Sequence, residues 1–275
     1  MIEELLVREF LVRTSHKPRP LPAGRWAMTQ RWNDLLFAHW TIPAVLLEPL
    51  LPEWLEPDTF QGSAWLGAVP FWLDRIKVRG VPTIPGVRNF PDLNFRTYVR
   101  DRLTGTPGVY CFSIDSSNLV TVAAAHAVYK LPYRLAEMHM EPRGEREFAF
   151  YSRRRFVRRA VIFKARYRGL GPTAKTAEIR PGSFEFFFSE RHCVFSANRT
   201  GEPIRAALHH VSWPLEEAEA EIERNDLAAA VGIALPKIDP VLHYARRMAV
   251  YIWPAELVRP ALAARPVTVA ATPMG

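Results

Sequence analysis

The sequence predicts a single β-rich α+β domain, built on a mostly antiparallel sheet with a few short helices. Many stretches of branched and aromatic residues alternate with polar residues at the two-residue period of a strand. The 24 prolines and 14 glycines among 275 residues indicate frequent turns rather than long helices. Neither an internal repeat nor a linker-like composition divides the chain. We therefore expect one domain over residues 26–260, between an N-terminal extension (1–25) and a weakly structured tail (261–275).

Strands are predicted where short runs of branched and aromatic residues end at Pro, Gly, Asn or Asp. In chain order they are 29–42, 63–73, 92–99, 109–115, 133–140, 147–154, 157–167, 176–180, 192–197, 204–211 and 241–253. A Pro- and Gly-containing loop at 80–89 is long enough to fold over the mouth of a pocket.

Short helices are predicted from capping signals and apolar residues at helical spacing. They are 3–12, 43–52, 119–129, 183–191, 214–224 and 227–232. Asn118 is a favourable N-cap for the helix at 119–129. The helix at 214–224 is predicted from a proline at its start and acidic residues in its first turn.

The strand at 92–99 is the most informative stretch, because its two faces differ in chemistry. One face is an ordinary β-core stripe of Leu93, Phe95, Thr97 and Val99. The other carries Asp92, Asn94, Arg96 and Tyr98. If the sheet closes on itself with this face inward, it lines a polar cavity for a small molecule. Which face points inward is not decided by the sequence.

Arg96 is the strongest candidate for binding a ligand, because a buried guanidinium requires an anion and holds a carboxylate with two hydrogen bonds. The alternatives are a structural ion pair with Asp92 or a solvated position at a sheet edge. Tyr98 could donate a hydrogen bond to a substrate oxygen, or pack in the core with its hydroxyl satisfied.

Positive charge is concentrated in one segment. From Arg143 to Arg168 the chain has ten Lys and Arg residues against two Glu, which equals the formal net charge of +8. Such an excess could bind an anionic partner. Residues 161–168 nevertheless alternate as a strand with a solvated basic face, and no nucleic-acid motif accompanies them. Nucleic-acid binding is therefore not expected.

The two cysteines, Cys111 and Cys193, are expected to be buried and reduced, because no partner lies at ligand spacing around either. His209 and His210 are adjacent, and neighbours in a strand point in opposite directions. No third ligand has an obvious spacing, so no metal and no cofactor are expected. No apolar run reaches the ~20 residues of a membrane helix. The N-terminal residues lack the basic and apolar regions of a signal peptide, so a cytoplasmic protein is expected.

Several segments resemble the YqjF-like proteins, a family containing domain of unknown function 2071. The carrying residues are 32–40 (WNDLLFAHW), 94–99 (NFRTYV), 107–110 (PGVY), 131–133 (LPY) and 190–191 (ER), and the match keeps its order from about residue 26 to 253. That family looks distantly related to acetoacetate decarboxylase. The resemblance implies a largely antiparallel sheet curled into a cone or barrel around an internal cavity.

The resemblance also implies site residues. The decarboxylase signature Gly-Arg-Glu-x-x-Gly-x-Pro-Lys-Lys is similar to residues 125–134, with its proline at Pro132. Its Schiff-base lysine falls on Tyr133 and its cationic neighbour on Arg134, while an upstream carboxylate corresponds to Asp92. A phenol cannot form an imine, so Schiff-base decarboxylation is not expected. Because adjacent strand residues face opposite ways, Tyr133 and Arg134 cannot both point inward without a bulge.

Two functions remain open at this point. The first is a lyase-like enzyme for a small oxo- or hydroxy-acid, with Arg96 binding the carboxylate and with Asp92 and Tyr133 handling protons. In that interpretation Asn94, Tyr98 and Arg134 complete the substrate site. The second is a ligand-binding protein of the same fold without catalysis, and docking to an anionic partner is a third. A homo-oligomer is also left open.

Overall fold

The computed structural model describes residues 10–17, 19–81, 89–177, 179–198 and 200–258. Its strands form one sheet: β1 (Met28–Ile42), β2 (Leu55–Pro57), β3 (Ala64–Val78), β4 (Phe90–Asp101), β5 (Pro107–Ser116), β6 (Tyr133–Pro142), β7 (Glu147–Arg154), β8 (Ile162–Gly171), β9 (Cys193–Ala197), β10 (Pro203–His209), β11 (Leu215–Asn225), β12 (Val241–Ile252) and β13 (Glu256–Leu257). The helices are α2 (Leu119–Val128), α3 (Ala174–Ala177), α4 (Phe184–Ser189) and three 3-10 turns, η1 (Ala44–Leu46), η2 (Glu48–Leu50) and η3 (Ala229–Val231). The predicted fold class is confirmed.

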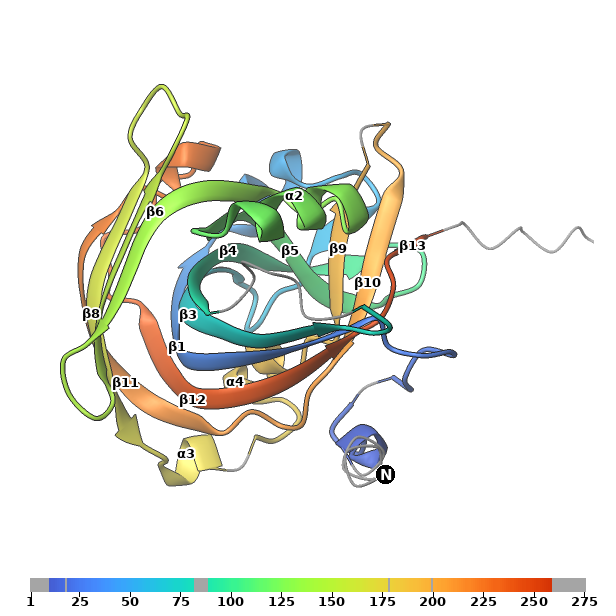
Figure 1. Ribbon diagram of the computed structural model, residues 1–275, viewed down its shortest axis with the longest axis horizontal. Coiled ribbons are helices and arrows are strands. Elements are labelled where there is room, and N and C mark those ends of the chain that lie inside the picture. The colour runs from blue at the N-terminus through green and yellow to red at the C-terminus, as the bar shows by residue number, and fades with distance from the viewer. Residues whose placement is uncertain (1–9, 18, 82–88, 178, 199, 259–275) are drawn as a thin grey trace, which may run out of the picture.

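Strand pairing closes the sheet on itself. The pairings run from β4 through β5, β6, β7, β8, β11, β12, β1 and β3, and return to β4. A shorter closure also exists, because β9 pairs with β5 and β10 while β10 pairs with β12. Among the strands that the structure describes, only the β5–β6 and β5–β9 pairings are parallel. In Figure 1, β6, β8 and β11 curve around one side of the molecule, and β9 and β10 complete the other.

β4, one of the strands shared by the two closures, has both faces inside the protein. On β4, Leu93, Phe95 and Val99 belong to the core that also contains Phe150 and Phe163, from β7 and β8. Tyr98, from the opposite face of β4, packs in a second core with Phe37, Phe188 and Trp213. This enclosure explains why β4 is buried almost continuously along its length.

The helix predicted over 214–224 is wrong, because these residues form β11. From Glu217 to Glu223 the segment reads Glu-Ala-Glu-Ala-Glu-Ile-Glu, which is the strict alternation of a strand with one solvated face. β11 pairs antiparallel with β8, so its acidic residues lie opposite the basic residues of that strand. The alternation was the signal that the proline and acidic first turn obscured.

Cross-strand ion pairs follow from this register. Glu219 accepts from Arg168 at 2.7 Å, and Glu223 accepts from Lys164 at 2.5 Å. Exposed pairs of this kind contribute little to stability, but they balance much of the positive charge predicted to be concentrated from Arg143 to Arg168. An anionic partner at this surface stays a prediction.

Most other boundaries agree with the sequence to within a few residues. The strand predicted at 176–180 is wrong, because Ala174–Ala177 forms the short helix α3. β8 begins at Ile162, five residues after the predicted start. The predicted helix at 3–12 lies mostly outside the described residues, of which residues 10–12 are helical. Most of the predicted loop at 80–89 and all of the predicted tail at 261–275 also fall outside them. No helix in the described ranges is long and apolar enough to cross a membrane.

Gly108 marks a close approach that the shorter closure requires. A Cβ at this position would lie 2.6 Å from the Cys193 carbonyl oxygen and 2.7 Å from the Phe195 ring, both on β9.

Gly108→Ala is therefore expected to lower the free energy of unfolding by about 1–3 kcal/mol through overpacking. Urea denaturation measures the loss. Gly144→Ala is the control, because its nearest neighbour would be at an ordinary 3.5 Å. A change of more than about 0.5 kcal/mol in the control, or none in Gly108→Ala, would contradict this explanation.

Candidate active site

A cavity of about 280 Å³ lies inside the shorter closure of the sheet. Its walls come from β1, β3, β4, β5, β9, β10 and β12, and α2 covers one side. Most lining residues are apolar, among them Ile76, Ile114, Val128, Leu208 and Ile252. The polar lining residues are Gln30, Asp92, Asn94, Arg96, Thr121, Tyr129 and Tyr133. The polar face of β4 therefore points inward, as the hypothesis of a small-molecule pocket requires.

A bulge in β5 shapes the wall next to β4. Phe95 pairs with Ser113 and Arg96 pairs with Cys111, so Phe112 is an extra residue in the register. Side chains of β5 change face at such a bulge. Cys111 and Ile114, three residues apart, consequently both line the cavity. They pack with Tyr133, which β6 brings beside Ile114.

Asp92 is the most perturbed acid of the cavity. It is only 1% exposed, and its Oδ1 atom has no hydrogen-bond partner among the described residues. The pKa of this carboxyl group is raised to about 8, chiefly by burial. Hydrogen bonds from Ser116 and Tyr133 oppose the rise, and the nearby Asp115 adds to it. Asp92 is therefore mostly protonated at neutral pH, a state in which a carboxylic acid donates a proton or a hydrogen bond.

Tyr133 stands beside Asp92, with its hydroxyl donating to Asp92 Oδ2 at 3.4 Å. Burial raises the pKa of this phenol well above its usual value, and the Asp92 carboxyl raises it further. The hydroxyl group therefore keeps its proton and acts as a donor. Arg134, the next residue, is exposed and does not line the cavity. The expectation that the two residues face opposite ways is met, and it is Tyr133 that points inward.

Arg96 is 8% exposed, and its guanidinium has few protein partners. Its Nη2 donates to the Tyr98 hydroxyl at 3.4 Å, whereas its Nε has no partner among the described residues. No described carboxylate lies within ion-pair distance of Arg96. The structure therefore does not show the alternative of an ion pair between Arg96 and Asp92. The two residues are four positions apart on one strand, which separates their Cα atoms by about 13 Å.

Tyr98 lies behind Arg96 and does not line the cavity. It is fully buried, and its hydroxyl is 2.6 Å from His39 Nε2. Burial and the Arg96 charge lower the pKa of His39 well below its usual value, so this imidazole is neutral. The pair holds the end of the Arg96 side chain rather than facing a ligand. His39 was missed by the sequence reasoning because nothing in β1 sets it apart from a core histidine.

The cavity contains no lysine among its described lining residues. The position that the resemblance assigns to the Schiff-base lysine is Tyr133, and its side chain does occupy the cavity wall. The lining residues contributed by α2, including Ala124 and Ala125, were also not identified as site residues from the sequence. Their small size lets the helix approach the cavity, but alanine carries no functional signal of its own.

The comparisons with known proteins agree with this architecture. Residues 29–249 match the family described as "Uncharacterized conserved protein", DUF2071. The chain is 39% identical to the uncharacterised protein YqjF of Bacillus subtilis (strain 168) over 242 residues, which are 88% of this chain and 97% of YqjF. The chain belongs to the DUF2071 family. The predicted resemblance is thereby confirmed.

Solved structures with the same fold are enzymes of low sequence identity. An acetoacetate decarboxylase-like enzyme from Sphingomonas wittichii RW1 matches with a TM-score of 0.59 at 12% identity, over 89% of this chain and 99% of that one. The acetoacetate decarboxylase of Legionella pneumophila matches at 0.52 and 16%, over 92% and 96%. The enduracididine biosynthesis enzyme MppR, in complex with pyruvate, matches at 0.58 and 13%, over 87% and 92%. The fold is thus that of acetoacetate decarboxylase.

The raised pKa of Asp92 predicts a pH-dependent cost to stability. The unfolded chain releases this proton near pH 3.8, whereas the folded protein holds it to about pH 8. The cost is absent below pH 3.8, grows between these values and is complete above pH 8, where it is on the order of 5 kcal/mol. Asp92→Asn should therefore stabilise the protein relative to wild type far more at pH 8 than at pH 4.5. Urea denaturation at both pH values measures this difference, and a difference independent of pH would contradict the assignment.

Proposed function

We propose that the cavity binds a small oxo- or hydroxy-acid and that the protein is an enzyme acting on it without a Schiff base. The observation that carries the proposal is the pair of unpartnered buried polar atoms on one face of β4, Arg96 Nε and Asp92 Oδ1. Leaving such atoms unsatisfied costs stability, so their retention inside an apolar cavity favours a ligand that satisfies them.

A second buried arginine in the same protein shows what a structural pair looks like. Arg154 Nε donates to Asp115 Oδ1 at 2.7 Å, and Ser152 donates to the other oxygen of Asp115. That arginine is satisfied by the protein alone, whereas Arg96 is not. The difference supports Arg96 as the group that binds the carboxylate of a ligand.

Asp92 and Tyr133 supply two proton donors at the other end of the polar face. With Arg96 holding the carboxylate, an oxo or hydroxyl oxygen farther along the ligand accepts from these groups. Protonated Asp92 then stabilises negative charge that develops on this oxygen, which is general acid catalysis. The separation of Arg96 and Asp92 along the strand favours acids longer than pyruvate. The apolar walls accommodate an alkyl chain.

The solved structures support the class of ligand. The MppR enzyme that shares this fold holds pyruvate, a 2-oxo acid, and other neighbours are decarboxylases of an oxo acid by name. In this chain the absence of a lysine from the described cavity wall argues against the imine route. The rival function is a binding protein that recognises the same acid without turning it over.

Ligand binding tests the role of Arg96. A series of straight-chain oxo acids, beginning with pyruvate and with the keto group placed progressively farther from the carboxylate, is added to wild type, and the Tm is measured. At about 100 times its Kd a ligand adds about 2.7 kcal/mol of stability, enough to raise Tm by about 5 °C or more. Arg96→Gln should weaken binding at least about tenfold, because a charge-assisted hydrogen bond is lost.

Arg100→Gln is the matched control for this test. Arg100 is on the same strand but pairs with Asp58 outside the cavity, so its loss should leave the ligand-induced shift unchanged. Equal weakening of binding in both variants, or no Tm shift with any acid, would contradict the proposed binding site.

The Asp92→Asn variant distinguishes an enzyme from a binding protein. If the protein is an enzyme, this variant loses turnover, followed by NMR of the acid, while binding is retained. If wild type turns over no acid that it binds, the binding protein is favoured.

Borohydride trapping tests the chemistry independently. If an oxo acid reacted with a lysine in the cavity, water would leave as the imine formed. Reduction of the imine would then add the mass of the ligand, less one oxygen atom, irreversibly to the protein. We expect no such adduct on intact-protein mass spectrometry, because Tyr133 stands in place of the amine. A stoichiometric adduct that a competing acid suppresses would overturn the proposal of a mechanism without a Schiff base.

A further inference from the structure

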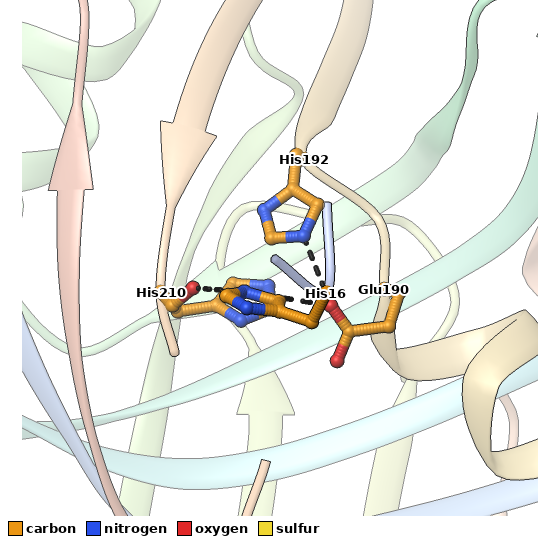
Figure 2. Close-up of side chains that lie close together, drawn as sticks. All are labelled: His16, Glu190, His192 and His210. Atoms are coloured by element: carbon orange, nitrogen blue, oxygen red, sulfur yellow. Dashed lines mark hydrogen bonds and ion pairs between the residues drawn. The ribbon is translucent and has the colours of Figure 1, made fainter. Parts of the chain in front are cut away.

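Four side chains outside the cavity form a cluster with the composition of a metal site. They are His16, Glu190, His192 and His210, and one potential ligand atom from each lies within 4.8 Å of all the others. Figure 2 shows the three imidazoles and, to one side of them, the Glu190 carboxylate. We propose that these residues bind one zinc ion, which fastens the N-terminal segment to the sheet.

The fold brings these residues together from three separate segments. β9 and β10 pair antiparallel with Cys193 opposite Ala207, so His192 and His210 flank the same end of this hairpin. Their rings stack with centroids 4.4 Å apart. Glu190 lies two residues before His192, just after α4. His16 comes from the N-terminal segment, so the sequence reasoning, which looked for ligands at regular spacing, could not see this set.

The hydrogen bonds fix the lone-pair nitrogens of two imidazoles in the cluster. His16 Nε2 donates to the backbone carbonyl of His210 at 2.9 Å, so the lone pair of His16 is on Nδ1. His210 Nδ1 is 2.8 Å from the backbone carbonyl of Val211, an arrangement that fixes its proton there and leaves Nε2 as the lone-pair nitrogen. The Trp213 indole approaches this Nε2 only at 3.4 Å, which is a weak contact. His192 is 9% exposed, and its Nδ1 has no hydrogen-bond partner among the described residues.

The charges around Glu190 also favour a cation. This carboxylate is 3% exposed, and among the described residues it lies close to His192 Nε2 at 3.0 Å, His16 Nε2 at 3.8 Å and the Ser212 hydroxyl at 3.4 Å. No described arginine pairs with it. A divalent cation would supply positive charge next to this buried carboxylate.

Lys17 is the charged group that opposes a cation. Its Nζ donates to the Leu208 carbonyl at 3.3 Å, and it lies close enough to influence Glu190 and the surrounding histidines. Lys17 is therefore expected to weaken the binding of a cation at this site.

Three imidazole nitrogens and one carboxylate oxygen suit zinc in a tetrahedral site. Zinc–nitrogen bonds of about 2.0–2.1 Å place ligand atoms roughly 3.3 Å apart, so small side-chain rotations are enough to close the cluster. A site with four protein ligands leaves no position for substrate, which is the pattern of a structural metal. Its position fits that role, because His16 is otherwise connected to the sheet through one hydrogen bond to the His210 carbonyl and through ring contacts.

The test uses the full chain purified without a polyhistidine tag. Elemental analysis should find about one zinc per chain, and zinc added to chelator-treated protein should raise Tm. Cobalt substituted for zinc should give the visible absorption of four-coordinate Co²⁺ without a thiolate charge-transfer band. A thiolate band would show that Cys193, next to His192, replaces one of the four ligands, and would overturn this set.

Variants assign the site. His16→Ala and Glu190→Gln should each weaken zinc binding at least about 100-fold, beyond the range for losing an outer-shell partner. His139→Ala is the control, since this histidine is exposed on β6 and should leave binding unchanged. Lys17→Met should tighten binding severalfold by removing the opposing charge. The proposal fails if wild type shows neither stoichiometric zinc nor a zinc-dependent Tm, or if the shift survives in both ligand variants. None of these outcomes depends on the function of the cavity.

Discussion

β4 is enclosed on both of its faces, and much of the remaining architecture follows from that enclosure. A strand in a sheet with one solvated side keeps its polar residues in water, but β4 belongs to two closures of the same sheet. Its apolar face packs in one core, whereas Asp92, Asn94 and Arg96 project into the cavity on the other side. Polar groups that would be unremarkable at a surface therefore become desolvated.

Desolvation then determines the chemistry of those groups. Asp92 responds by keeping its proton, since burial penalises the charged form of a carboxyl group. Arg96 cannot respond in the same way, because a guanidinium remains charged in proteins. The cavity therefore combines a fixed cation with a neutral acid, in an environment where electrostatic interactions are stronger than in water. Tyr98 and His39 support the cation from behind without neutralising it.

The shorter closure also connects the cavity to the histidine cluster. β9 and β10 form part of the cavity wall, and the same hairpin carries His192 and His210 at one end. A metal ion there would hold the hairpin, the end of α4 and the N-terminal segment together. The metal ion would affect the cavity by making part of its wall more rigid, because its four ligands lie outside the set of cavity-lining residues.

Local patterns in the sequence were sufficient for much of the fold and for part of the site. The two-residue alternation in 92–99 separated the polar face from the apolar one, and the family resemblance placed Tyr133 at the position of a lysine. The same kind of alternation from Glu217 to Glu223 was overlooked in favour of helix-start signals, although it was present in the sequence.

The sequence by itself determined which residues share a face of a strand, because side-chain direction follows from backbone geometry within one segment. Only the tertiary structure decided what each face meets. The inward direction of the β4 polar face depends on closure of the sheet through β9 and β10. That Tyr133 points inward, and not Arg134, depends on the pairing of β6 with β5. The meeting of His16 with Glu190, His192 and His210 joins residues distant in the chain, and no spacing rule encodes such contacts.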